Sequence, residues 1–140
     1  MSDATARWLA DCEALRTLTQ RYSRAIDERD HDALDQLFHP DGSVDGVRGP
    51  STVHDYLAAL RTTAPAGASM HVLGEPLIEL EPGADEANLD TYAVVHQIPT
   101  TSDDAHRMLG IRYVDRVVRS GDAWVIFHRQ ARMLWSRELG

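Results

Sequence analysis

The chain has 140 residues, 43% hydrophobic and 26% charged, a balance typical of one folded domain with a hydrophobic core. Its formal net charge of −8 argues against a nucleic-acid partner, because phosphate binding requires a basic surface. All 14 basic residues are arginine, and the lack of lysine excludes Schiff-base catalysis and lysine-dependent phosphate loops.

Three helices are predicted in the first half of the chain. Apolar residues recur at three- and four-residue steps over residues 5–28, which indicates a long amphipathic helix. A shorter helix is predicted over 31–38, with Asp30 as its N-cap and a turn at 39–42 after it. A short strand over 43–47 then leads to a third helix over 51–63, with Ser51 as a candidate cap and Pro65-Ala66-Gly67 closing it.

The second half of the chain is predicted to form strands. Residues 70–81, 88–98, 106–119 and 123–135 are separated by turns at 82–83, 99–104 and 120–122. Short turns between successive strands indicate an antiparallel meander, and helices followed by strands indicate the α+β class. We therefore expect a single domain over 1–140, in which a cone-shaped, curved antiparallel sheet wraps around three N-terminal helices. Such a cone leaves a pocket open at one end.

Several features limit the cofactors and the location of the protein. Cys12 is the only cysteine, so an internal disulfide and a cysteine-based metal cluster are excluded. The seven histidines do not fall at metal-ligand spacing, and we expect neither a metal nor another cofactor. The first 18 residues lack the apolar stretch of a signal peptide, and no window approaches the roughly 20 apolar residues of a membrane span. We expect a cytoplasmic protein without membrane contact.

Asp27 and His71 are candidates for acid–base chemistry. Asp27 lies at the C-terminal end of the first predicted helix, where the helix dipole disfavours a carboxylate. His71 is predicted to open a strand, and histidine is the side chain best matched to proton transfer near neutral pH. Taken alone, each also fits a structural role, as a solvated carboxylate or a hydrogen-bonded histidine. Tyr22 is offset from Asp27 by about 140°, so the two share a face only if the helix loosens.

The later strands carry further polar candidates. Tyr92 and His96 share one strand face, while Asp115 is expected in a cross-strand salt bridge. Arg129 and Arg132 have opposite parity, so only one of them faces the core, where a buried arginine requires an anionic partner. The pattern leaves open which of the two is buried. The remaining candidates are histidines expected in solvent, on helix surfaces or turns: His31, His39, His54 and His106.

The chain resembles a known family over nearly its whole length. The run LRTLTQRYSRAIDERDHDALDQLFHPDGSVDG, residues 15–46, is similar to the opening of SnoaL-like proteins in the nuclear transport factor 2-like superfamily. The resemblance continues in MHVLG (70–74), YVDR (113–116) and GDAWVIFHR (121–129). It implies the cone fold that the predicted elements also indicate.

Within that superfamily the chain resembles scytalone dehydratase, hexachlorocyclohexane dehydrochlorinase and bile acid dehydratase. The resemblance implies catalytic roles for Tyr22, Asp27, His71 and Arg129, in an elimination that proceeds by Asp–His acid–base catalysis. His71 removes a proton and Asp27 orients His71. Tyr22 donates a hydrogen bond to the carbonyl or the departing oxygen, and Arg129 or His96 assists it. We expect a hydrophobic cyclic or polycyclic substrate, contacted by His96, Trp8, Tyr56, Leu73, Tyr92, Met108 and Phe127.

Other functions fit the same fold, because fold alone does not determine function. An isomerase or cyclase acting on similar substrates is the nearest alternative, followed by a non-catalytic binding or assembly subunit. An epoxide hydrolase is less favoured, because no Asp–Arg–Asp set is evident. The resemblance also implies a homo-oligomer, with a trimer favoured over a dimer. Its contact would form through the open sheet face, where the last strand carries Trp124 and Trp135.

Overall fold

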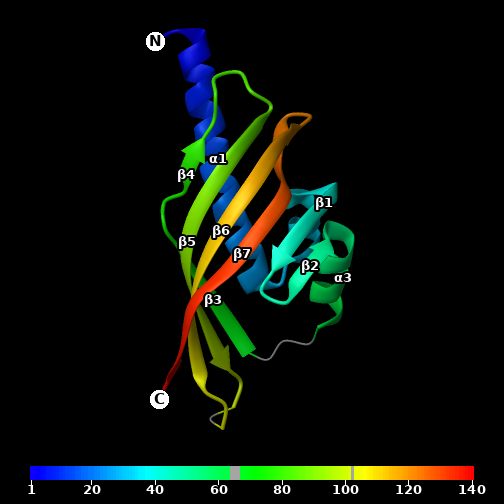
Figure 1. The fold of residues 1–140 in the computed structure, drawn as a ribbon, viewed down its shortest axis with the longest axis vertical. Helices are drawn as coiled ribbons and strands as arrows, with labels where there is room; N and C mark the ends of the chain where they lie inside the picture. The colour runs from blue at the N-terminus through cyan, green and yellow to red at the C-terminus, as the bar shows by residue number, and fades with distance from the viewer. Residues whose placement is uncertain (64–66, 102) are drawn as a thin grey trace.

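The computed structural model describes residues 1–63, 67–101 and 103–140; Pro65 and Ala66 of the predicted turn, and Ser102, lie outside the described residues. Within these ranges the chain forms three helices and seven strands (Figure 1). The helices are α1 (Asp3–Glu28), α2 (His31–Leu37) and α3 (Val53–Thr62). The strands are β1 (Phe38–Gly46), β2 (Gly49–Thr52), β3 (Gly67–Leu73), β4 (Leu77–Glu79), β5 (Glu86–Pro99), β6 (His106–Ser120) and β7 (Ala123–Leu139).

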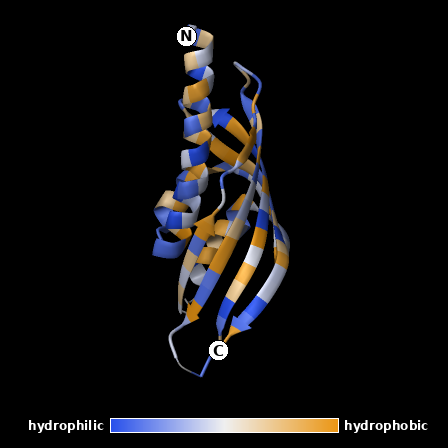
Figure 2. Ribbon diagram, turned by 90° about the vertical axis from the view of Figure 1, so that its left-hand side faces the viewer, coloured by the Kyte–Doolittle hydropathy of each residue, from blue (hydrophilic) through white to orange (hydrophobic). Residues whose placement is uncertain are grey.

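The strands form one sheet in the order β2-β1-β7-β6-β5-β3, with β4 paired to β5. Strands β3, β5, β6 and β7 pair antiparallel with one another, as predicted. The sheet as a whole is mixed, because β1 runs parallel to β7. Helix α1 lies along one face of the curved sheet, which we call the inner face (Figure 2). The α+β class and the sheet wrapped on N-terminal helices are thus confirmed.

Local signals explain where the helices begin and end. Ser2 caps α1 by accepting a hydrogen bond from the Thr5 backbone N–H, and Asp30 caps α2 as predicted. The prediction of Ser51 as the third cap is wrong. Thr52 accepts the bond from the Asp55 N–H, and the residues before it form β2. In the described residues, no helix combines the length and the apolar character needed to cross a bilayer.

Two strands differ from the prediction. The segment 39–42, predicted as a turn, belongs to β1, which pairs with β7 through a register shift between Phe38 and Ser43. Gly42 permits this close approach, because a Cβ there would lie 2.3 Å from the backbone oxygen of Phe127. The predicted strand 70–81 is instead two strands, β3 and β4, separated by Gly74-Glu75-Pro76. Proline cannot donate a backbone hydrogen bond, which explains the interruption.

The hydrophobic core lies between α1, the shorter helices and the inner face. In β5 and β6 the buried residues alternate with more exposed ones, which is the expected pattern for a sheet covered on one side. The buried residues of these two strands are small or aliphatic, apart from Tyr113, Thr91 and Asp115. The members on β5 and β6 that belong to the core cluster are Ala87, Leu89, Ala93, Val95, Leu109, Ile111, Tyr113 and Val117.

A polar contact attaches the N-terminal half of α1 to the sheet. Asp11 accepts two hydrogen bonds from the Arg119 guanidinium, at 3.1 and 2.9 Å, and one from the Trp124 indole at 3.2 Å. The bond from Arg119 lowers the pKa of Asp11, although burial opposes the shift. Arg119 also bonds the exposed Asp85 at 3.1 Å. Asp11 is therefore the buried anchor of this contact and Asp85 a peripheral partner.

We predict that Asp11→Asn lowers the free energy of unfolding by about 1.5–3 kcal/mol at pH 7, because it weakens a bond to a charged partner. A carboxyl group whose pKa is lowered by folding stabilises the fold above its unfolded pKa, about 3.9, and loses this effect as the pH falls through its folded pKa. The difference between wild type and variant should therefore shrink below about pH 4. Urea titrations at pH 7 and pH 3 measure both quantities.

Asp85→Asn is the matched control, because its side chain is 80% exposed and its pair with Arg119 should contribute only about 0–1 kcal/mol. An Asp11→Asn effect as small as that of the control, or equally large at pH 3 and pH 7, would contradict this account of the anchor.

Candidate active site

The carboxylate of Asp27 joins the C-terminal end of α1 to β3. Its Oδ1 accepts hydrogen bonds from His71 Nδ1 at 2.7 Å and from Ser69 Oγ at 2.8 Å. Its Oδ2 accepts the backbone N–H of His71, also at 2.8 Å. The side chain of Asp27 is 19% exposed and that of His71 only 8%. Asp27 is therefore not a solvated helix-end residue; it holds a specific histidine.

Helix α1 brings both Tyr22 and Asp27 to the sheet without loosening. It stays helical to Glu28, and Arg29 then ends it in the left-handed region at φ 55°, with its N–H bonded to the carbonyls of Ala25 and Ile26. The two side chains leave the helix in different directions, but α1 contacts both β3 and β7. The sheet curves around the helix, so each direction meets a different strand.

The hydrogen bonds of Asp27 determine the tautomer of His71. An ionised carboxylate only accepts hydrogen bonds, so Nδ1 carries the proton in the 2.7 Å bond to Oδ1. In the neutral ring, Nε2 then has a free lone pair and is the nitrogen that can accept a proton. The backbone bond from His71 to the same carboxylate fixes the position of the strand as well as the ring.

A second polar group lies deeper on the inner face. Arg129, which is 2% exposed, donates from Nε and Nη2 to the two oxygens of Asp115, at 2.7 and 2.8 Å. Its guanidinium carbon lies 4.0 Å from the ring centroid of Tyr22 and 4.2 Å from that of Tyr113. This arrangement confirms the expected cross-strand salt bridge of Asp115 and identifies its partner.

The structure resolves which arginine is buried. Strands β6 and β7 shift register between Arg116 and Val117, which leaves Phe127 as an extra residue between paired His128 and Ile126. Ile126 and Arg129 therefore both reach the core despite their opposite parity, whereas Arg132 is exposed. A sequence pattern with a strict period of two cannot locate such a bulge.

Tyr22 and Tyr56 form a hydroxyl pair beside this arginine. Their oxygens lie 2.8 Å apart, and the Tyr22 ring contacts the ring of Phe38 edge-on. Burial raises the pKa of the Tyr56 phenol well above its usual range, and the neighbouring Tyr22 raises it further. Burial likewise raises the pKa of Tyr113. Tyr56 and Tyr113 therefore stay protonated and keep a hydroxyl hydrogen available for donation.

The structure places the other predicted contact residues in different regions. Leu73 lies on the inner face, two residues after His71 on β3. Trp8 lies about 28 Å along α1 from Asp27, by helix rise, and its indole bonds the Leu80 carbonyl. Phe127 lies at the bulge, with the Arg116 guanidinium 4.6 Å from its ring centroid. These last two therefore contribute nothing to the surroundings of His71.

Strand β5 faces the opposite way from the prediction. Tyr92, 60% exposed, lies on the outer face with His96, and cross-strand pairing places Met108 there too. The inner face instead presents smaller side chains, which leave room for α1. Pairing sets Val95 beside His71, with Leu109 beyond it, and Ala93 beside Leu73. The wall next to His71 is therefore apolar; it includes the predicted Leu73 but also Val95 and Leu109, which were not predicted.

Sequence reasoning named Tyr22, Tyr56 and Arg129 but missed Ser69 and Thr91. Strand parity carries the signal for Ser69, because it lies two residues before His71 and so points to the same face. Two buried polar atoms on this face also lack a hydrogen-bond partner within the described residues: Thr91 Oγ1 and Arg129 Nη1. Thr91 pairs across the strands with Tyr113, next to Arg129. Each atom therefore has unused hydrogen-bonding capacity on the inner face.

For metal ions, the described residues contain no group of three or more histidine, cysteine, aspartate or glutamate side chains arranged to hold one. The pair of Asp27 and His71 is a hydrogen-bonded dyad, an arrangement that can transfer a proton. Apolar side chains of the inner face lie on one side of the dyad. The tyrosine rings that pack on Arg129 lie on the other side.

Comparisons with known proteins agree with this architecture. The SnoaL-like domain family model matches residues 7–130. A hexachlorocyclohexane dehydrochlorinase (LinA) type 2 structure is 15% identical with a TM-score of 0.83, covering 94% of this chain and 90% of that one. The LinA type 3 enzyme of Novosphingobium barchaimii LL02 is 16% identical with a TM-score of 0.80, covering 94% and 92%.

A third structure has the same fold. It is a protein of Novosphingobium aromaticivorans DSM 12444, provisionally assigned as a scytalone dehydratase, which is 20% identical with a TM-score of 0.81. The match covers 100% of this chain and 93% of that one. No curated protein matches the chain by sequence. The resemblance inferred from the sequence motifs is confirmed, and at these identities the structural matches establish the fold.

We predict that Asp115→Leu lowers the free energy of unfolding by about 3–5 kcal/mol, because it leaves Arg129 buried without its anion. The double variant Asp115→Leu/Arg129→Met should recover much of this loss, since it removes both charges. Arg112→Met, in the partly exposed pair with Asp90, is the matched control and should cost about 0–1 kcal/mol. Denaturant unfolding measures all three; a double variant less stable than Asp115→Leu alone would contradict the account.

Proposed function

The chain belongs to the SnoaL-like family, and we propose that it is a cofactor-independent lyase. In this proposal it removes water or a hydrogen halide from a hydrophobic cyclic or polycyclic small molecule, with His71 as the base. The observation that carries the proposal is the set of three hydrogen bonds that Asp27 accepts from β3. These bonds direct His71 Nε2 toward the inner face.

The elimination proceeds through the groups already described. Nε2 of His71 takes a proton from a carbon next to a carbonyl or leaving group, and the electron pair of that C–H bond forms the new double bond. The bond to the leaving group breaks, and the group departs with its electron pair. His71 becomes an imidazolium ion, which the Asp27 carboxylate stabilises at 2.7 Å. The proton on Nε2 then passes to solvent.

The tyrosine pair fits the role of assisting the departure of the leaving group. The raised pKa of Tyr56 keeps its hydroxyl protonated, so the 2.8 Å pair with Tyr22 retains a hydrogen that can be donated to a leaving oxygen or a carbonyl. The unpaired Arg129 Nη1 supplies a further positive donor in the same region. Donors fixed in a largely water-free site stabilise developing negative charge more strongly than donors in water.

The wall next to His71 supports an apolar substrate. Leu73, Val95 and Leu109 line the inner face on the His71 side, and the last two are at least 94% buried. The dehydrochlorinase and dehydratase names of the similar structures support elimination over other reactions on this fold. An isomerase would use the same base but return the proton to the substrate, so product analysis separates the two.

We expect His71→Ala to lower the rate of elimination by about 10²–10⁴-fold, the usual contribution of a general base. Asp27→Asn should lower it by at least about 100-fold, because it removes the acceptor that fixes the ring. Ring-containing β-hydroxy ketones and chlorinated cyclohexanes are the test compounds. Loss of water or chloride is followed by product absorbance and mass.

His54→Ala is the control, since this exposed histidine lies in the first turn of α3, away from the dyad. Equal rates in wild type, His71→Ala and Asp27→Asn would reject the mechanism. If the wild type binds these compounds without turnover, and His71→Ala binds equally well, the chain is a binding protein and the lyase proposal is wrong.

We further propose that copies of the chain associate through the outer face of the sheet. Trp124 is 6% exposed and belongs to the core, so it does not take part. Val72, Tyr92, Leu134 and Trp135 are 43–60% exposed and line an apolar hollow of about 350 Å³ on that face. Trp135 lies flat over Gly110, where a Cβ would be 2.1 Å from the indole nitrogen, so the hollow has a defined shape. An exposed apolar patch of this kind is typical of an interface.

Trp135→Glu should convert the oligomer to monomers, because it places a charge at the centre of the proposed contact. Leu9→Glu, at a 46% exposed position of α1, should leave the assembly intact. Light scattering coupled to size-exclusion chromatography gives both masses. A monomeric wild type, or an unchanged mass for Trp135→Glu, would overturn this proposal.

A further inference from the structure

Two histidines and two methionines gather on the outer face, at the ends of β3, β5 and β6 opposite to the chain's N-terminus. His96 of β5 lies between Met70 of β3 and Met108 of β6, each directly opposite it in the strand register. His106 lies two residues before Met108 and so shares its face. Directly opposed residues have Cβ atoms about 4.5–5.5 Å apart, so the four side chains form one cluster.

The two imidazole rings already lie at chelating distance. His96 Nδ1 and His106 Nε2 are 3.0 Å apart, so a single hydrogen lies between them: one nitrogen donates it and the lone pair of the other accepts it. A metal ion that replaces this hydrogen at about 2.0 Å from each nitrogen would subtend an angle of about 97°. That angle is acceptable for first-row transition metals once both rings turn so that their lone pairs point at the ion.

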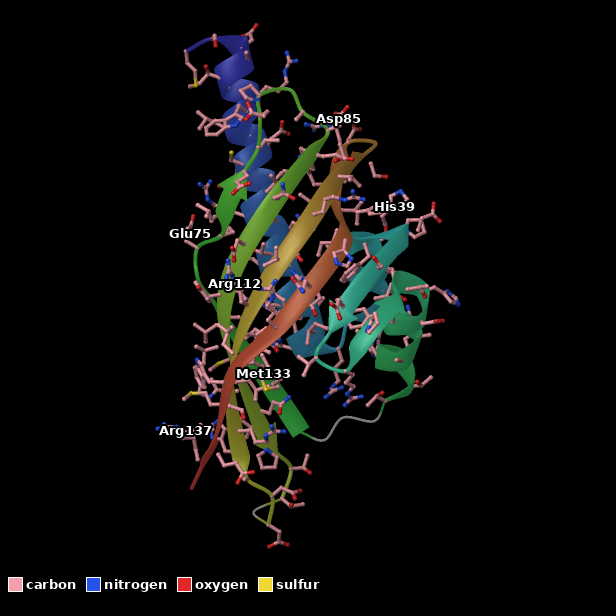
Figure 3. All side chains as sticks on the ribbon, in the orientation of Figure 1. His39, Glu75, Asp85, Arg112, Met133 and Arg137 are labelled. Carbon is pink, nitrogen blue, oxygen red and sulfur yellow. The ribbon has the colours of Figure 1, made fainter. Side chains whose placement is uncertain are left out.

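The chemistry of the cluster selects among metal ions. Imidazole nitrogen and thioether sulfur are both neutral, and thioether is a soft ligand that favours monovalent copper. Both rings hydrogen-bond to each other and to no carboxylate within the described residues. The charged neighbour on this face is Arg137, which pairs with Met108 across β6 and β7 and extends beside the C-terminal part of β7 (Figure 3). A nearby arginine disfavours a divalent ion more than a monovalent one.

We propose that Met70, His96, His106 and Met108 form a binding site for Cu(I). The site needs no redox step, because the ion binds in the state in which it is supplied. It is separate from the Asp27–His71 dyad, which lies on the other face of the sheet. It also lies outside the apolar hollow, whose lining includes none of the four residues. The proposal therefore stands independently of the proposed lyase activity.

Anaerobic titration of the full chain with Cu(I) against a chromophoric chelator tests the site. We expect one ion per chain and at least about a 10-fold loss of affinity in His96→Asn/His106→Asn, since even indirect support of a metal is commonly worth 10–100-fold. Met70→Leu/Met108→Leu should also lose Cu(I) affinity by about 10-fold, yet bind Ni(II) as the wild type does through the remaining imidazoles. His54→Asn and Met133→Leu are matched controls and should bind Cu(I) like the wild type.

The NMR signals of the methionine methyl groups in the wild-type protein give a test that does not depend on whether the variants fold. With methyl-labelled methionine, Cu(I) should shift the signals of Met70 and Met108 and leave that of Met133, on β7, in place (Figure 3). Wild-type affinity in the double histidine variant would overturn the site. Wild-type Cu(I) affinity in the double methionine variant, or unshifted Met70 and Met108 signals, would overturn the assignment to Cu(I).

Discussion

One carboxylate determines the geometry on which the rest of the site depends. Asp27 accepts hydrogen bonds from Ser69 Oγ, from the His71 backbone and from the His71 ring, so the end of α1 and the strand β3 cannot shift relative to one another without breaking a charged contact. Position and tautomer of the histidine follow from the same group. The unfavourable location of this aspartate at a helix C-terminus is thereby offset by three donors from a neighbouring strand.

The curved sheet supplies the surroundings that make such a dyad useful. Its inner face carries an apolar wall beside His71 and, further in, the ion pair of Arg129 and Asp115 between two tyrosine rings. A buried ion pair gives little net stability compared with a well-packed apolar core. Within the described residues the ion pair leaves Arg129 Nη1 unpaired, and Thr91 Oγ1 on the same face is also unpaired. Two such atoms fit a site that contacts a polar atom of a substrate.

Periodicity and family motifs together predicted the helices, the long strands and the Asp27–His71 contact. They failed where the backbone departs from a regular period. The bulge at Phe127 reverses which residues of β7 point to the core after it. Gly42 allows β1 to continue through a segment whose sequence predicted a turn. On β5 the bulky Tyr92 lies outside, because the helix leaves room only for small residues inside. Such choices depend on packing across elements, which no local pattern records.

The most direct test of the central claim is the protonation of His71 observed by NMR. With nitrogen-15-labelled histidine, the account predicts that the neutral His71 ring carries its hydrogen on Nδ1, seen as a downfield proton that disappears in Asp27→Ala. The pattern of two-bond couplings identifies the tautomer. A neutral ring protonated on Nε2, or a ring signal that Asp27→Ala leaves unchanged, would contradict the account, because His71 would then have no free nitrogen directed to the substrate.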